Sequence, residues 1–409
     1  MSTNVRVQPD LKFVKELQSV GGESLKKCYQ CATCSVVCPL SPADAPYPRK
    51  EMVWAQWGLK DRLLTDIDIW LCHNCGTCSD LCPRGAKPGD LLAALRNMAY
   101  RNLAKPTCIG KWMSSSNYLP LLLLIPAAIY MLIWILRAGV LKSFFPLKDG
   151  AVVYGHLFPG DFTIDPIFGA VFLFMVIAFA SGIKNLLASF KGMPKTFVVG
   201  RGKEPGFLSC LIDTIKEEVA QHSRFRDCGT APKDVQRFQG HLFLFYAFVA
   251  LAIVTGVVAT GHWGGEFFLK HVLKFDDPLT NLLAAAGHTP MSLANPVKVL
   301  ANTGALAMVI GLIYLTKRRL SLDKAKSSSS WYDWYLLTVI WSICITGVGS
   351  EFLRLVNIPH LAYPTYYLHL ISVFMLIAYL PWSKLGHLVY RVVGIAYARK
   401  IGRMPPPRH

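Results

Sequence analysis

The sequence predicts a mainly α-helical protein with a water-soluble N-terminal domain followed by a six-helix transmembrane bundle. Three observations support this fold class. Of the 409 residues, 53% are hydrophobic and only 17% are charged, which is too apolar for a purely soluble chain. The apolar residues concentrate after about residue 117 in long stretches. Charge, proline, glycine and a repeated cysteine pattern characterise the part before it.

The apolar stretches each come close to the ~20 residues that a helix needs to cross a bilayer. They cover residues 118–136, 166–190, 241–261, 296–316, 332–350 and 366–386. A run of serines, Ser114-Ser115-Ser116, precedes the first stretch. We therefore expect a soluble domain of residues 1–116, a membrane domain of residues 117–390 and a basic tail of residues 391–409.

Lysine and arginine are unevenly distributed over the connections between these stretches. Residues 1–17 lack the apolar core of a cleaved signal peptide, so we expect the N-terminal domain to lie in the cytoplasm. Residues 191–240, 317–331 and the chain after residue 387 then also face the cytoplasm, and they are the basic connections. This bias predicts an inner (cytoplasmic) membrane protein with both termini in the cytoplasm. Most of the positive charge behind the formal value of +18 therefore lies at the cytoplasmic surface of the membrane, beside anionic headgroups. No nucleic acid is expected as a partner.

Eight cysteines form two copies of one pattern in the N-terminal domain. The copies are Cys28-x2-Cys31-x2-Cys34-x3-Cys38-Pro39 and Cys72-x2-Cys75-x2-Cys78-x3-Cys82-Pro83. This is the bacterial ferredoxin pattern for 4Fe–4S clusters, in which the fourth cysteine of each run binds the other cluster. One cluster is therefore assigned to Cys28, Cys31, Cys34 and Cys82, and the second to Cys72, Cys75, Cys78 and Cys38. The pattern predicts a helical two-cluster ferredoxin-like domain.

Zinc is the alternative for such cysteines, since it also accepts four thiolates, usually from two CxxC pairs. A zinc site needs neither a third cysteine at this spacing nor the trailing Cys-Pro, so iron–sulfur clusters are favoured. Disulfides are not expected because the cytosol keeps thiols reduced. The remaining cysteines lack this spacing and are assigned no role; they are Cys108, Cys210, Cys228 and Cys344.

Histidines at the ends of two predicted helices suggest haem ligation in the membrane domain. His241 opens the third helix and His262 closes it, while His369 and His387 lie on the sixth. Because these helices run in opposite directions, His241 faces His387 and His262 faces His369, which predicts two bis-histidine sites for haem b. His369 and His387 would lie roughly 27 Å apart on one helix face.

The fit of the third helix is less regular, since His241 and His262 are roughly 31 Å apart and about 60° out of register. His156, His271 or His288, in the outer connections, is an alternative to His262. His222 and His360 are interpreted as structural residues, and His73, next to Cys72, as a surface residue that at most tunes a cluster by hydrogen bonding. The sequence shows no glycine-rich dinucleotide motif and no phosphate-binding loop, so no flavin or nicotinamide site is expected in this chain.

The cysteine runs resemble the small iron–sulfur subunit of heterodisulfide reductases, called the C subunit. The membrane half looks like the haem b subunit of that enzyme, called the E subunit, and like the gamma subunit of respiratory nitrate reductase. The fusion of both in one chain is similar to the C subunit of the quinone-interacting membrane-bound oxidoreductase (Qmo) complex of sulfate-reducing microbes. In the nitrate reductase type, both ligands of the earlier helix lie closer together than His241 and His262.

This resemblance implies an electron-transfer subunit that passes electrons from menaquinol, through b haems and two 4Fe–4S clusters, to partners. The implied partners are flavin-containing heterodisulfide reductase A-like subunits and adenylylsulfate reductase, within sulfate respiration. A protein that feeds a heterodisulfide-type reductase is the alternative. A transporter or scaffold with zinc is disfavoured because the halves of the membrane domain show no matching broken helices.

Overall fold

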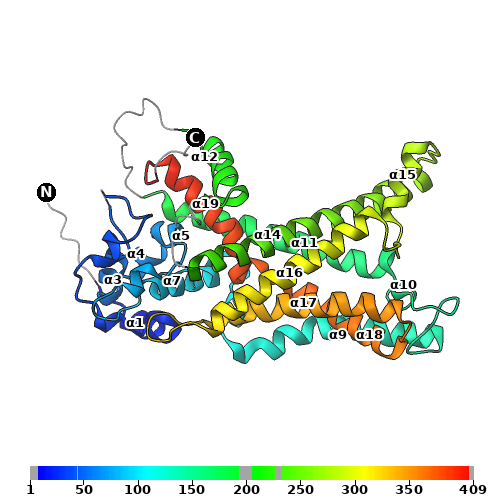
Figure 1. Cartoon of the computed structure of the whole chain (residues 1–409), viewed down its shortest axis with the longest axis horizontal. Helices are drawn as coiled ribbons and strands as arrows, with labels where there is room; N and C mark the ends of the chain where they lie inside the picture. The colour runs from blue at the N-terminus through cyan, green and yellow to red at the C-terminus, as the bar shows by residue number, and fades with distance from the viewer. Residues whose placement is uncertain are drawn as a thin grey trace.

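The computed structural model describes residues 8–43, 45–192, 205–223, 225, 228 and 232–404. The regular elements of these residues are helices, and the β-structure among them is a single isolated bridge between Lys148 and Ala151. The predicted mainly α-helical fold is confirmed. The N-terminal domain lies at one end of a long helical bundle, and α15 (Pro278–Gly287) lies at the other (Figure 1).

The N-terminal domain packs short helices around one long helix, α7 (Pro88–Leu103). Proline in the first turn of α7 lacks only an N–H that would have no partner inside the helix. The α7 residues Leu95 and Tyr100 are buried with Trp70, whose ring meets the Tyr100 ring edge-on at 5.7 Å. The other helices of this domain are α1 (Leu11–Leu17), α2 (Thr33–Val36), α3 (Arg49–Gln56), α4 (Lys60–Leu64), α5 (Asp68–Leu71), α6 (Thr77–Asp80) and α8 (Thr107–Met113).

Among the residues that the structure describes, six helices are long and apolar enough to cross a membrane, as predicted. They are α9 (Leu119–Leu141), α11 (Asp165–Phe190), α14 (Pro232–Ala259), α16 (Pro296–Leu320), α17 (Trp331–Leu355) and α18 (Pro359–Ala378). Local signals fix their starts: Asn295 caps α16 ahead of Pro296, and Ser330 and Asp333 form a capping box on α17. Leu124 and Phe172 remain exposed on the outside of the bundle, as lipid-facing residues would be. The chain is therefore a membrane protein.

Glycines let α14 and α16 approach closely. A Cβ atom on Gly311 would lie 2.8 Å from the backbone nitrogen of Leu244 and 2.9 Å from the oxygen of Gly240. Small residues at such crossings bring two backbones into contact, which is how helices associate in a membrane without a hydrophobic driving force. Beyond Ala259, α14 continues as a π-helical segment, Thr260–Val272.

The sixth span differs from its prediction, which placed His369 and His387 on one continuous helix. That expectation is wrong, because α18 ends at Ala378 and two short turns, Leu380–Trp382 and Lys384–Gly386, follow. Pro381 offers no N–H to continue the helix, and the Ser383 side chain caps the next turn by accepting from the Leu385 N–H. His387 begins a separate helix, α19 (His387–Lys400).

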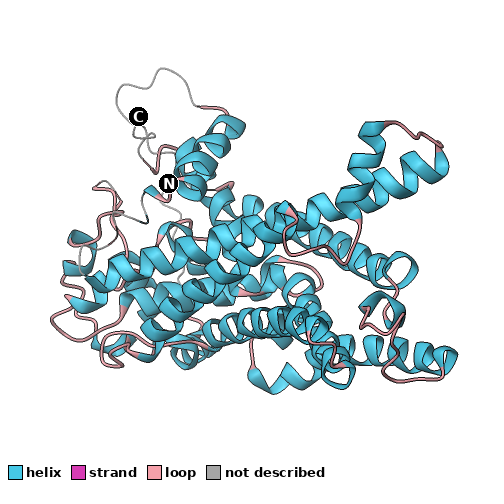
Figure 2. Ribbon diagram, turned by 45° about the vertical axis from the view of Figure 1, so that its right-hand side comes forward, coloured by secondary structure: helices cyan, strands magenta, loops and turns pink. Residues whose placement is uncertain are grey.

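The expected basic tail is part of this folded structure up to residue 404. Nε of Arg403 donates to Asp68 at 2.9 Å, and Nε of Arg391 donates to the oxygen of Trp70 at 2.8 Å. α12 (Phe207–Thr214), the amphipathic stretch of the long connection, packs beside α19, so both helices lie at the end of the bundle that carries the N-terminal domain (Figures 1 and 2). The domain boundaries at residues 116 and 390 stay predictions.

The connection between α16 and α17 lies against the N-terminal domain. Nζ of Lys87 donates to the oxygen of Lys324 at 2.7 Å, and the carboxylate of Asp90 accepts from the hydroxyls of Ser327 and Ser328 at 3.0 Å each. The basic connection 317–331 therefore lies at the same end of the bundle as the cysteine domain.

Candidate cofactor sites

The two cysteine runs adopt the same local fold. In each, a left-handed residue follows the first cysteine by two positions, Gln30 with φ 61° and Asn74 with φ 51°. Their N–H groups donate to the sulfur atoms of Cys28 and Cys72 at 3.4 and 3.3 Å. The threonine hydroxyls of Thr33 and Thr77 lie 3.4 Å from the second cysteine of each run, at the start of α2 and α6. These repeated hydrogen bonds fix the orientation of the first and second cysteine sulfurs of each run.

The first site gathers Cys28, Cys31, Cys34 and Cys82. Burial raises the pKa of the Cys34 thiol to about 11, and the nearby charges of Cys28, Cys82 and Cys31 act in the same direction. Such mutual repulsion between thiolates disappears when they bind a cationic centre, so these four fit a metal cluster.

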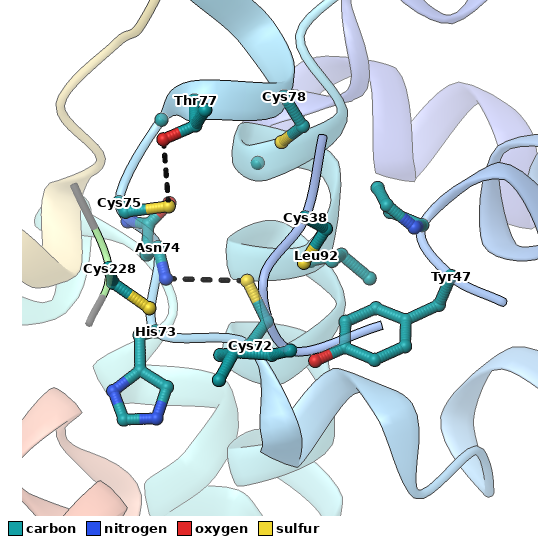
Figure 3. Close-up of a pocket in the computed structure, with 14 residues that line it drawn as sticks. Cys38, Tyr47, Cys72, His73, Asn74, Cys75, Thr77, Cys78, Leu92 and Cys228 are labelled. Atoms are coloured by element: carbon teal, nitrogen blue, oxygen red, sulfur yellow. Dashed lines mark hydrogen bonds between the residues drawn. The ribbon is translucent and has the colours of Figure 1, made fainter. Parts of the chain in front are cut away.

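The second site gathers Cys38, Cys72, Cys75 and Cys78, whose side chains line one pocket (Figure 3). Burial raises the pKa of Cys38 to about 12, and the charges of Cys72 and Cys75 act in the same direction. The structure therefore brings the eight cysteines together in the two sets that the spacing predicts, with the fourth cysteine of each run exchanged. Their ligation of clusters stays a prediction.

The spacing of the sulfur atoms disfavours a single zinc ion. Four thiolates around one zinc at 2.3 Å lie about 3.8 Å from one another. Among the described residues, no group of three cysteine sulfurs lies mutually within 4.8 Å. The wider spacing fits the four corners of a cluster better than one ion.

His241 and His387 face each other between α14 and α19. Their ring centres lie 6.4 Å apart. Two imidazoles that bind one metal from opposite sides have a similar separation, since each metal–nitrogen bond is about 2 Å. Nδ1 of His387 lies 2.7 Å from the oxygen of Lys384, and donation through Nδ1 leaves Nε2 with a lone pair for a metal. Nδ1 of His241 is buried with no partner in the described structure. This pair fits a bis-histidine haem.

His369 lies in the middle of α18 and is also held through Nδ1. The hydroxyl of Thr346 lies 3.1 Å from Nδ1 of His369 and donates its own hydrogen to the oxygen of Ser342. The His369 Nδ1–H is therefore the donor, and Nε2 carries the lone pair. This is the tautomer that haem ligation needs.

His262 is engaged elsewhere, at the end of the bundle opposite the cysteine domain. Its Nε2 lies 2.8 Å from the carboxylate of Asp161, and its Nδ1 lies 3.7 Å from Glu266. No ring contact between His262 and His369 occurs in the described structure. Of the alternatives, His271 bonds the oxygen of Glu266 at 2.8 Å, while Nδ1 of His156 is buried without a partner in this part of the structure. The pairing of His262 with His369 stays a prediction.

The connection before α14 supplies residues between the two kinds of site, and sequence reasoning missed them. The ring of Phe225 lies 4.9 Å from that of His241 and 5.8 Å from that of His73, which follows Cys72. His73, interpreted as a surface residue, is buried. His222 also lies 5.1 Å from His241, ring centre to ring centre.

Cys228 is a further missed residue. It lines the pocket of the second site (Figure 3), and its interaction with Cys75 is the main cause that lowers the pKa of Cys75 to about 5. No signal in the sequence identifies these neighbours, because a single cysteine or phenylalanine in a long connection carries no spacing pattern.

Comparisons with known proteins agree with the cysteine sites. The family model described as a 4Fe-4S dicluster domain matches residues 24–86. The C subunit of the H(2):CoB-CoM heterodisulfide,ferredoxin reductase of Methanothermobacter marburgensis is 37% identical over 91 residues, which are 22% of this chain and 49% of that protein. The C2 iron-sulfur subunit of the CoB–CoM heterodisulfide reductase of Methanocaldococcus jannaschii is 43% identical over 95 residues, 21% of this chain and 50% of that protein.

A second kind of protein is also similar to this chain. The E subunit of the dihydromethanophenazine:CoB–CoM heterodisulfide reductase of Methanosarcina thermophila is 24% identical over 160 residues, 37% of this chain and 55% of that protein. The chain spans about half the length of these curated relatives. No solved structure matches it. One chain therefore combines similarity to the C and the E subunits of heterodisulfide reductases.

Proposed function

We propose that this chain is the membrane electron-transfer subunit of a quinone oxidoreductase complex of the Qmo kind. When bound, b haems and two 4Fe–4S clusters supply one-electron transfer from menaquinol toward cytoplasmic partners, while the protein positions and tunes them. The observation that carries the proposal is the continuous contact from His387 and His241, through Phe225, to His73 beside Cys72.

His241 and His387 would hold the haem b nearer the cysteine domain, and the half-buried Phe225 and the buried His73 lie between them and Cys72 and limit the access of water to this route. His369 would hold a second haem b, with His156 as its other ligand in place of His262, whose Nε2 lies 2.8 Å from Asp161. Nδ1 of His369 and Nδ1 of His387 each form a hydrogen bond, which fixes the orientation of both rings.

The first cysteine site offers a route by which electrons could pass to partner proteins. Cys31 is exposed, and the large apolar side chains of Tyr29, Val36 and Leu81 around it are 68%, 83% and 54% exposed. The guanidinium of Arg84 lies 4.0 Å over the Tyr29 ring. Exposed apolar groups of this size mark protein contact sites. We propose flavin-containing heterodisulfide reductase A-like subunits as the partners, with adenylylsulfate reductase in sulfate respiration as the destination.

The orientation in the inner membrane follows from charge. The cysteine domain and the basic connections lie at one end of the bundle, and positive residues favour the cytoplasmic side. Both termini would therefore lie in the cytoplasm, and the quinone would be oxidised within the membrane domain.

A reduced-minus-oxidised visible spectrum of the detergent-solubilised protein, with a menaquinol analogue as reductant, tests this function. We expect sharp b-type haem bands on quinol addition. The broad iron–sulfur absorption should bleach on the same timescale. Absence of haem bands in protein that retains iron and sulfide would contradict the membrane half of the proposal.

The second candidate function is the feeding of electrons to a disulfide reductase, favoured by the names of the similar C and E subunits. Affinity purification of the chain from its source distinguishes the two candidate functions. A disulfide reductase subunit among the co-purified proteins supports the second candidate, and flavoproteins without it support the first.

A further inference from the structure

Arg96 holds the main chain where the second cysteine run begins. It lies on α7, the helix that follows this run, and its Nη1 donates to the oxygens of Ile69 and Cys72 at 2.8 and 2.7 Å. The two acceptors are the first cysteine of the run and the residue three positions before it. Arg96 is 8% exposed, and a guanidinium keeps its positive charge inside a protein. A buried cation therefore lies against the backbone of a proposed cluster ligand.

A neutral amide occupies the equivalent position at the first site. Gln56 ends α3, the helix that follows the first run, and its Nε2 donates to the oxygens of Leu25 and Cys28 at 3.1 and 3.0 Å. These acceptors are again the first cysteine and the residue three positions before it. Nε2 of Gln30 donates to Oε1 of Gln56 at 2.8 Å, which fixes the orientation of the amide. The two sites, alike in backbone, therefore differ in charge at one matched position.

Two further guanidinium groups bond the main chain around Cys72. Nε of Arg391 donates to the oxygen of Trp70 at 2.8 Å. Nη1 of Arg237 donates to the oxygen of the residue that follows Cys72 at 3.1 Å. The carboxylate of Glu218 lies 3.7 Å from Nε2 of that same residue and opposes these charges, but it is itself paired with an arginine of α19. Positive charge therefore predominates where the second run begins.

We propose that the buried charge of Arg96 raises the reduction potential of the second cluster. This inference rests on the proposed function. Reduction adds one negative charge to a cluster, and a cation shielded from water stabilises that charge more strongly than an exposed one. Charge and solvent exposure are among the determinants of cluster potential. The transfer moves one electron from the reduced haem to the oxidised cluster with no bond made or broken, and Arg96 keeps its proton throughout.

The position of Arg96 places this effect next to the haem side. Arg96 bonds the oxygen of Cys72, and the ring of the following residue, His73, contacts that of Phe225, which in turn contacts His241. The second cluster would therefore be the one that receives an electron from the haem. A raised potential at this cluster favours that transfer, whereas the amide at the first site gives no such stabilisation.

The test is a redox titration followed by electron paramagnetic resonance on full-length protein in detergent. Arg96→Gln gives the second site the neutral amide of the first, and Arg96→Lys keeps a positive charge at the same position. Arg49→Gln is the matched control, since this exposed guanidinium donates to the oxygen of Gln30 at 2.9 Å in the first run, where water screens its charge. Cys75→Ser identifies the signal of the second cluster. Iron and sulfide contents are measured for every variant.

We expect Arg96→Gln to retain both clusters and to lower the midpoint potential of the second signal alone. At a fixed potential, the ratio of reduced to oxidised second cluster should fall by about tenfold or more, which corresponds to about 59 mV for one electron. Arg96→Lys should restore most of this shift, because the charge is responsible for it. Arg49→Gln should leave both midpoint potentials close to those of the parent protein.

An unchanged midpoint potential in an Arg96→Gln protein with both clusters overturns the inference and leaves the proposed function intact. Equal shifts in Arg96→Gln and Arg96→Lys also overturn it, because the shape of the arginine and not its charge would then be responsible. A parent protein without two cluster signals contradicts the proposed function itself.

The reciprocal variant, Gln56→Arg, decides the case in which Arg96→Gln loses the second cluster. Gln56 is half-buried, and an arginine there brings a cation to the matched main-chain oxygens of the first site. We expect the midpoint potential of the first signal to rise while that of the second stays unchanged. No rise in a Gln56→Arg protein that holds both clusters overturns the inference.

Discussion

Nη1 of Arg237 donates a hydrogen bond of 3.1 Å to the main-chain oxygen of His73, the residue that follows Cys72. Arg237 lies one helical turn before His241 on α14, so a single helix carries both a histidine of the candidate haem site and a direct bond to the second cysteine run. The separation of the two sites is therefore fixed by buried side chains rather than by a loose linker.

Replacing Cys75 by serine should remove the second cluster and leave the helices folded. Serine is a poor ligand for iron–sulfur clusters compared with a thiolate, and the first site keeps all four of its cysteines. We expect roughly half of the iron and sulfide to be lost, with an unchanged helical circular dichroism spectrum. Cys108→Ser, at an exposed cysteine outside both sites, is the control. Full iron content in Cys75→Ser would contradict the ligand assignment.

Replacing His387 by alanine should eliminate the haem that we propose between α14 and α19. Its ring faces that of His241 at 6.4 Å, and its orientation is fixed through the Lys384 oxygen, so alanine leaves His241 without the opposite ligand. We expect haem content, measured as the pyridine haemochrome, to fall while cluster signals persist. His360→Ala is a suitable control because that ring packs against Phe145 at the start of α18, whereas α19 follows the other end of α18. Unchanged haem in His387→Ala would refute this role.

His369 and His262 should respond differently to alanine substitution. His369 is held in the tautomer that leaves Nε2 for a metal, whereas Nε2 of His262 already lies 2.8 Å from Asp161. We expect His369→Ala to lose a second haem and His262→Ala to retain it. Equal loss of haem in both variants would instead establish the His262–His369 pair that the sequence predicts. Haem content and the low-spin resonance of each variant give the answer.

Arg403→Ala should destabilise the junction between the C-terminal segment and the cysteine domain. Arg403 donates to Asp68, whose side chain is fully buried, and removing one member of a buried pair costs about 3 kcal/mol. Nζ of Lys50, at 2.6 Å from Asp68, still balances part of the charge of this carboxylate in the variant. The loss of folding free energy should therefore fall at the low end of such effects.

Thermal unfolding of the detergent-solubilised variants measures this effect. Lys60→Ala is the matched control, because its ion pair with Asp10 is 4.0 Å long and exposed, and it should change stability by less than about 0.5 kcal/mol. Equal melting temperatures for Arg403→Ala and Lys60→Ala would show that the C-terminal segment contributes nothing to the junction.

Local chemistry explains why much of the fold and of the cysteine sites can be predicted. Hydropathy over about 20 residues identifies a membrane span without knowledge of its neighbours, and the cysteine run determines its own loop because the first sulfur of each run bonds an N–H two residues on. The exchange of Cys38 and Cys82 needs contact between the two runs, but it can be predicted because it accompanies the repeated pattern. The spans and the loop of each run need no contact between distant parts of the chain.

The sequence by itself determined the helical class, the six spans and the two sets of four cysteines. The spans depend on residues close together along the chain, and the cysteine sets follow from a repeated pattern whose pairing is known. Only the tertiary structure decided that α18 ends before His387, that His262 turns to Asp161, and that Cys228 and Arg237 meet the second cysteine run. Those relationships depend on how separate helices pack, and packing joins side chains whose positions in the sequence carry no common period. The physical reason is that a helix end or a buried contact is selected by the free energy of the whole assembly, not by the local pattern alone.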